Sequence, residues 1–152
     1  MARPTMRLRG TGVEPMKHLI LIMSLFLFAP GAAALANDLP PLHENRTVRF
    51  SFYSAGLADI VRNNCPELDG RMLRGLRYAL ALRSYALDQG YTMDDVDALL
   101  ANKVEEEKLR KEIVADLAAR GATPGNTEAY CRIGREEIAK DSLAGRLLRD
   151  RG

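Results

Sequence analysis

Apolar residues recur at helical spacing along most of the chain from residue 47 onward, and no segment shows the two-residue alternation of a half-buried strand. The spacing predicts four main helices and a short last one, at about 47–63, 67–89, 93–120, from 127 onward and from 142 onward. In the second of these helices the apolar face consists of Met72, Leu73, Leu76, Leu80 and Leu87. Because amphipathic helices bury such a face against their neighbours, we expect it to lie in the core.

Helix-breaking residues separate these segments. The residue before Pro66 is disfavoured in a helix, and Gly90 and Gly121 are typical of helix C-termini. Four amphipathic helices with short connections predict a compact all-α array. Glycine inside a helix costs about 1 kcal/mol relative to alanine, so we expect Gly75 to lie where a neighbouring helix packs closely.

A leader typical of secretory signal peptides precedes the helical part. Lys17 and His18 lead into an apolar run at 19–29, and Ala34-Leu35-Ala36 matches a cleavage site of small residues. The run is shorter than the about 20 apolar residues that a membrane-spanning helix needs. We therefore expect cleavage after Ala36, with an uncleaved N-terminal anchor as the alternative.

Removal of this leader (residues 1–36, with translation starting at Met1 or Met16) changes the charge of the chain. The whole sequence has 22 Lys and Arg and 20 Asp and Glu, and the leader carries four of the basic residues and one of the acidic residues, which leaves 18 and 19. The mature chain is thus nearly neutral, which gives no basis for predicting nucleic acid or an anionic membrane as a partner. We expect a flexible linker at 37–46, a single helical domain at 47–150 and no transmembrane segment in the mature chain.

The mature chain contains two cysteines, Cys65 and Cys131. In an exported chain an even number of cysteines favours a disulfide, and two cysteines allow one intramolecular pairing. A bridge between them would tie the first and last main helices together. Two free buried thiols or an intermolecular bridge are the alternatives.

The sequence offers little for metal binding or catalysis. The one histidine after residue 36 is His43, so no cluster of His and Cys has metal-ligand spacing. A Ser or Cys nucleophile needs a base within hydrogen-bond reach, and His43 is the one imidazole that could serve. We therefore predict no metal, no cofactor and no catalytic residue. Paired carboxylates could still cleave glycosidic bonds. The candidates are Glu136 or Glu137 together with Asp59, Asp69 or Asp116.

Arginines are the best candidates for a binding site, because they could hold an anionic ligand or the carboxylates of a partner. The predicted binding residues are Arg71, Arg74, Arg77 and Arg146. A solvated face paired with local acids is the alternative interpretation. Phe50, Phe52 and Tyr53 could form a further docking surface, but we expect them to pack in the core.

Several short motifs follow one another in a fixed order: Asn64-Cys65-Pro66, Arg71-Met72-Leu73, Gly90-Tyr91, Arg120-Gly121, Tyr130-Cys131 with Gly134, Glu137-Ile138, and Ser142 followed by Gly145-Arg146-Leu147-Leu148. In this order they resemble a family of small exported alphaproteobacterial proteins that is classed as a domain of unknown function. The resemblance covers most of residues 50–149 and implies a Gram-negative envelope setting. It implies no activity, ligand or site.

These observations favour a small exported, non-enzymatic helical protein of the bacterial envelope, periplasmic or secreted. Its expected role is to bind a protein or another envelope component. A carboxylate-based peptidoglycan hydrolase is one alternative. A periplasmic chaperone that exposes apolar helix faces under acid stress is the other.

Overall fold

The computed structural model describes residues 39–151, so the predicted signal peptide lies outside the described residues. The elements are η1 (Leu42–Glu44), α1 (Arg46–Asn64), β1 (Leu68–Gly70), α2 (Met72–Asp88), α3 (Met93–Ala101), α4 (Lys103–Ala119), α5 (Thr127–Ala139), α6 (Leu143–Leu147) and β2 (Leu148–Asp150). Of these, η1 is a single 3-10 turn. The prediction of an all-α fold tied by one disulfide is confirmed.

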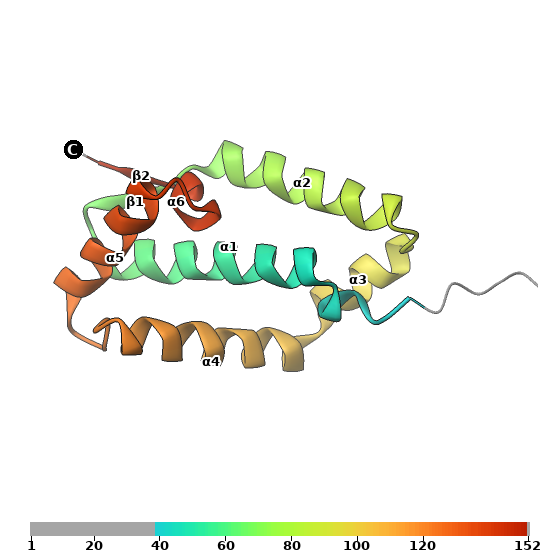
Figure 1. Cartoon of the computed structure of the whole chain (residues 1–152), viewed down its shortest axis with the longest axis horizontal. Coiled ribbons are helices and arrows are strands. Elements are labelled where there is room, and N and C mark those ends of the chain that lie inside the picture. Colours follow the sequence, from blue (N-terminus) through green and yellow to red (C-terminus); the bar gives the residue numbers. More distant parts are fainter. Residues whose placement is uncertain (1–38, 152) are drawn as a thin grey trace, which may run out of the picture. The chain divides into compact units, whose positions relative to one another are not determined.

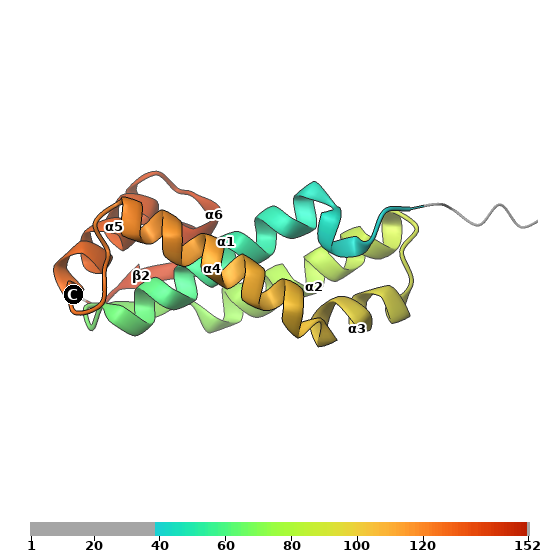
Figure 2. The same ribbon diagram turned by 90° about the horizontal axis from the view of Figure 1, so that it is seen from below.

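The central helix of this domain is α1. α2 lies along one side of it and α4 along the other, while α5 and α6 pack around its C-terminal half (Figure 1). The second view shows α3 and α5 at opposite ends of α4 (Figure 2). α1 therefore contacts nearly every other element.

The main core lies where α1, α4 and α5 meet. Val61 of α1 and Ile133 of α5 have no exposed surface, and Ile113 of α4 is almost as buried. Gly134 brings α5 so close to α1 that a Cβ atom there would lie 2.7 Å from Val61 Cγ1 and would also overlap Leu68. Glycine is therefore required at this contact.

A smaller cluster closes the opposite end of the domain. Leu42 of η1 is buried with Val48 of α1 and with Tyr91, which follows α2. The Tyr91 hydroxyl donates a hydrogen bond to the carbonyl oxygen of Pro40 at 3.0 Å. The expectation of a flexible linker throughout 37–46 is therefore wrong from Pro40 onward, because the burial of Leu42 fixes this segment.

Cys65 and Cys131 form a disulfide with an S–S distance of 2.03 Å and a Cα–Cα distance of 5.0 Å. Cys65 directly follows α1, Cys131 lies in α5, and both side chains are buried. The predicted pairing is confirmed, and it joins the central helix to the fourth of the predicted helical segments.

A small antiparallel sheet was not predicted. β1 pairs with β2, with Leu68 opposite Asp150 and Gly70 opposite Leu148. The second predicted helix, expected from 67, therefore begins at Met72. The reason is tertiary, because the pairing buries Leu68 and Leu148 against the core although the two strands lie far apart in the sequence.

The predicted helix at 93–120 is in fact two helices, α3 and α4, that meet at Asn102. This residue has a non-helical backbone (φ −79°, ψ 84°), and its side-chain oxygen accepts a hydrogen bond from the Glu105 backbone amide at 3.1 Å. Asparagine is among the preferred N-cap residues, so it starts a new helix here.

Replacing both Cys65 and Cys131 by serine should lower the free energy of unfolding by about 4 kcal/mol, because the bond closes a long loop and so restricts the unfolded chain. The two cysteines are 66 residues apart. Urea unfolding followed by circular dichroism measures the effect. Reduced wild-type protein should unfold at the same urea concentration as the double variant, and a midpoint that does not change on reduction would contradict the prediction.

Candidate functional site

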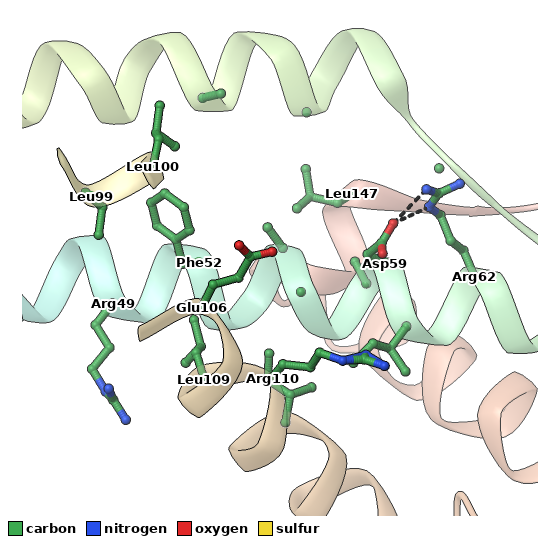
Figure 3. Close-up of a pocket in the computed structure, with 18 of the residues that line it drawn as sticks. Arg49, Phe52, Asp59, Arg62, Leu99, Leu100, Glu106, Leu109, Arg110 and Leu147 are labelled. Carbon is green, nitrogen blue, oxygen red and sulfur yellow. Dashed lines mark hydrogen bonds and ion pairs between the residues drawn. The ribbon is translucent and has the colours of Figure 1, made fainter. Parts of the chain in front are cut away.

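A large groove lies between α1, α2 and α4. Its volume is about 840 Å³, and its lining comes mainly from these three helices, with Leu99 and Leu100 of α3 and Leu147 of α6 at other positions. In the close-up view, Phe52 points from α1 toward Leu100, and Leu109 and Arg110 enter from α4 (Figure 3). α1 thus forms the floor of the groove, and α2 and α4 form its two walls.

α2 has apolar residues on two faces. One face packs on its own chain, where Ala86 is buried and Leu82 and Tyr85 lie against the cluster around Leu42. On the same side the Tyr78 hydroxyl lies 2.7 Å from Ser51 Oγ of α1, and Ser51 is almost fully buried. These contacts fix which side of α2 faces α1.

The other face of α2 has no cover within residues 39–151. Its members remain exposed: Met72 is 74% exposed, Leu73 73%, Leu76 58%, Leu80 49% and Leu87 39%. The expectation that this face is buried in the core is wrong, because the second apolar face of α2 makes the contact with α1. We call Leu73, Leu76, Leu80 and Leu87 the leucine stripe.

Gly75 also differs from expectation. A Cβ atom at this position would have nothing within 4 Å, so no helix within residues 39–151 packs against it. Gly75 instead lines the groove together with Leu76 and Ala79 of α2 and Gly56 of α1. The small side chains of Gly75 and Ala79 on the α2 wall leave room for a backbone to approach closely.

The expectation that the aromatic residues at the start of α1 pack in the core is wrong for Phe50, which is 59% exposed. Phe52 is also exposed and lines the groove. Tyr53 is half-buried and packs against the main core.

The predicted binding arginines lie along α2 and on α6. Arg71 lines the groove at the N-terminus of α2, and Arg77 is exposed on α2. The structure brings Arg74 and Arg146 together, since Arg74 Nη1 donates a hydrogen bond to the Arg146 carbonyl oxygen at 3.1 Å. Arg146 itself lies 3.6 Å from the Asp141 carboxylate. A binding role for these four residues stays a prediction.

Charge pairing differs between the two walls of the groove. On α4 most charges are paired locally, as in the Lys103–Glu106 bridge of 2.6 Å and the Lys108–Glu105 bridge of 2.5 Å. The arginines of α2 form no ion pair with any acidic side chain of residues 39–151. The guanidinium groups without an ion pair or a hydrogen bond to described residues include Arg71, Arg77 and Arg83 on the α2 side and Arg110 on α4.

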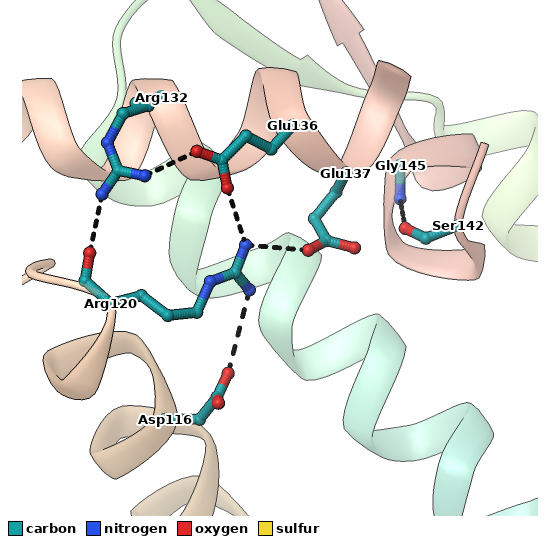
Figure 4. A network of polar contacts seen from close by, with 7 residues as sticks. All are labelled: Asp116, Arg120, Arg132, Glu136, Glu137, Ser142 and Gly145. Atoms are coloured by element: carbon teal, nitrogen blue, oxygen red, sulfur yellow. Dashed lines mark hydrogen bonds and ion pairs between the residues drawn. The ribbon is translucent and has the colours of Figure 1, made fainter. Parts of the chain in front are cut away.

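Three of the carboxylates considered for glycoside cleavage converge on one arginine. Arg120 lies 3.8 Å from Asp116, 3.3 Å from Glu136 and 2.9 Å from Glu137 (Figure 4). Glu136 is also held by Arg132 at 2.5 Å. This cluster joins the end of α4 to α5 and gives these carboxylates a structural role.

The electrostatics of this cluster favour the ionised form of Glu136. The hydrogen bond from Arg132, and then that from Arg120, lowers the pKa of Glu136 below its usual value. Burial and the neighbouring Asp116 carboxylate raise the pKa of Tyr53 to about 12. A general acid needs the opposite perturbation of a carboxyl group, a raised pKa.

The two remaining candidates are also paired with arginines. Asp59 accepts hydrogen bonds from Arg62 at 2.6 and 3.0 Å, and Asp69 accepts one from Arg149 at 2.6 Å. The Arg149 contact lowers the pKa of Asp69. The geometry therefore gives no support to a carboxylate pair acting as acid and nucleophile. No group of three or more potential metal-ligating side chains occurs among the described residues.

Comparison with known proteins assigns the family. Residues 40–149 match DUF5333, a family of unknown function. The chain belongs to this family. No curated protein and no solved structure matches it. The match spans both cysteines and the groove, so the groove lies within the part of the chain that defines the family. None of the helices in residues 39–151 combines the length and the apolarity that crossing a bilayer requires.

The sequence contains one signal for the groove that its helical periodicity alone does not reveal. α2 has Tyr78, Leu82 and Tyr85 in addition to its leucine stripe, so it is apolar on more than one side. A helix that is apolar all round is normally buried on all sides. Here one of those sides has no partner among residues 39–151.

Replacing Gly75 by alanine should raise the free energy of unfolding by about 1 kcal/mol, because alanine favours the helix and its Cβ atom meets nothing. Gly134→Ala is the matched control and should lower it by about 1–3 kcal/mol through overpacking. Urea unfolding of both variants measures the difference. Destabilisation by Gly75→Ala would contradict the prediction.

Replacing Glu136 by glutamine should lower stability near neutral pH and flatten its dependence on pH in acid. A carboxyl group whose pKa is lowered on folding stabilises the protein above its unfolded-state pKa, and this contribution is lost as pH falls through the folded-state pKa. The difference between wild type and variant should therefore be present above pH 4.5, the ordinary pKa of Glu, and disappear below it. Urea unfolding over a pH series measures this stability difference.

Asp97→Asn is the control, because Asp97 has no ion pair within residues 39–151. Parallel stability curves for wild type and Glu136→Gln would contradict the prediction.

Proposed function

We propose that this chain is an exported, non-enzymatic binding protein of the bacterial envelope, and that its groove holds a helical segment of another protein. The observation that carries the proposal is the leucine stripe of α2, which remains exposed although the opposite side of the same helix packs on α1 and on the cluster around Leu42. Monomeric proteins seldom leave a continuous apolar surface of this kind without a binding role.

The dimensions of the groove support a helical occupant. A volume of about 840 Å³ corresponds to about two turns of a helix about 10 Å in diameter. Helix-in-groove binding uses apolar anchors at helical spacing, and both walls of this groove are themselves helices. A bound helix would take the place of a further helix between α2 and α4.

Export is supported by two independent features of the chain. Residues 1–36 have the pattern of a signal peptide, and the Cys65–Cys131 bond is of the kind that persists in oxidising compartments such as the periplasm. The resemblance to exported alphaproteobacterial proteins agrees with this setting. The periplasm is the proposed location.

A photoreactive amino acid placed at position 76 in the full-length chain, expressed in its native host, should crosslink to a discrete partner. Leu76 lines the groove, so a bound helix would lie within reach of it. Mass spectrometry identifies the adduct and the crosslinked segment. The same amino acid at Val114, which is 45% exposed but lies outside the groove, serves as the matched control.

Filling the groove should remove this adduct. Gly75→Trp projects a large side chain into space that no atom of residues 39–151 occupies, so the fold should persist while the crosslink at position 76 is lost. Equal adducts at positions 76 and 114, or an adduct unaffected by Gly75→Trp, would contradict the proposal. Adducts with many unrelated unfolded proteins would instead favour the chaperone alternative.

A further inference from the structure

We infer that the partner of this groove is an amphipathic helix at least four turns long, with acidic side chains along the edge that faces α2. The inference rests on the proposed function and specifies the chemistry of the occupant. It follows from the length of the leucine stripe and from the distribution of unpaired charge around it.

The length of the leucine stripe sets the length of the partner. Leu73 and Leu87 are fourteen residues apart on one helix, which corresponds to about 21 Å at about 1.5 Å per residue. Leu76 is the one residue of the stripe in the groove lining, and Leu73, Leu80 and Leu87 lie outside that lining. A small ligand inside the groove would therefore leave these three leucines uncovered, whereas a helix running parallel or antiparallel to α2 would cover the whole stripe.

The charges on α2 determine which side chains the partner should carry beside its apolar face. Arg77 is four residues after Leu73 and three before Leu80, and Arg83 is three after Leu80 and four before Leu87, so both are helical neighbours of the stripe. α2 contains Arg74, Arg77 and Arg83 but one acidic residue, Asp88. A partner that places carboxylates beside Arg77 and Arg83 would provide the ion pairs that these side chains lack within residues 39–151.

The opposite wall agrees with this assignment. Arg110 of α4 lines the groove and has no ion pair among the described residues, whereas the nearby Glu106 is already paired with Lys103. The lining residues with uncompensated charge are thus positive on both walls, Arg71 at the start of α2 and Arg110 on α4, while Arg77 and Arg83 flank the leucine stripe outside the groove lining.

This charge pattern disfavours a second copy of the chain. If α2 packed on α2 of another molecule, the Arg77 and Arg83 guanidinium groups of both copies would gather along one interface without acidic partners. Like charges placed together destabilise an interface. An anionic membrane would suit the arginines, but a flat bilayer surface would not fill a concave groove whose floor is α1.

Two designed peptides of 21 residues test the inference on the exported, oxidised protein purified from the envelope. Both peptides carry leucine at the seam positions of three heptads; one has glutamate at the flanking positions and the other has lysine. Fluorescence anisotropy should show the glutamate peptide binding about tenfold more tightly at low salt, as expected from two or three exposed ion pairs. The preference should shrink at high salt because exposed charges are screened.

Matched variants separate charge from apolar contact. Arg77→Gln with Arg83→Gln should remove most of the preference for glutamate while leaving binding of the lysine peptide unchanged or stronger. Leu76→Gln with Leu80→Gln should weaken both peptides, and both leucines are exposed enough for the fold to persist. Val114→Gln is the control and should change neither.

Each other outcome has a distinct meaning. Equal binding of both peptides overturns the acidic edge and leaves the groove as a binding site. If neither peptide binds but the crosslink at position 76 still forms, the inference of an amphipathic helical partner is overturned and the proposed function stands. If neither peptide binds and no crosslink forms, the proposed function is overturned as well. Binding only to phosphatidylglycerol vesicles, or a dimer dissociated by Leu76→Gln with Leu80→Gln, overturns the inference in favour of a membrane or a second copy.

Discussion

Packing at the C-terminal end of α1 determines the arrangement of the rest of the domain. There the Cys65–Cys131 bond and the close contact at Gly134 bring α5 against α1, and the pairing of β1 with β2 attaches the segment that leads into α2. The Arg71 amide extends this attachment by donating a hydrogen bond to the Leu147 carbonyl oxygen at 2.8 Å. At its other end α2 is held by the cluster that includes Leu42 and Tyr91. A helix fixed at both ends does not need to bury all of its apolar side chains in order to keep its place.

The helices could be predicted from periodicity and the cysteine pairing from the number of cysteines, because both depend on information that is local or unambiguous. Helical spacing is repeated within each segment, and two cysteines allow one bridge within the chain. The sheet could not be predicted in this way. Leu68 and Leu148 are each compatible with a helix end, and their pairing depends on the completed fold around α1. The break at Asn102 is an intermediate case, since an N-cap residue within an otherwise helical pattern is a weak signal by itself.

The candidate site was predicted less well than the fold, and for a physical reason. An apolar stripe indicates that a surface avoids water, but it does not indicate whether the cover comes from the same chain. Leu76 and Gly75 both suggested intramolecular packing, yet Leu76 is exposed and a Cβ atom at Gly75 would meet no other atom within residues 39–151. The arginines provide a separate signal, because Arg77 has no acidic residue of its own helix within one turn on either side. The leucine stripe and the arginines without acidic partners in residues 39–151 lie on the same helix. Together they indicate the chemistry of the proposed partner, which neither feature does alone.

The contact between Tyr78 and Ser51 determines how α2 presents this surface. The Ser51 hydroxyl donates its one proton to the Thr47 carbonyl oxygen at 2.6 Å, so the Tyr78 hydroxyl must be the donor in its own bond to Ser51. α2 cannot roll about its axis to turn its leucines inward without breaking that bond in a buried place, which is costly. The proposed recognition surface is thus preorganised: α2 is held in one rotational setting, so association with the proposed partner would need little further ordering of this helix.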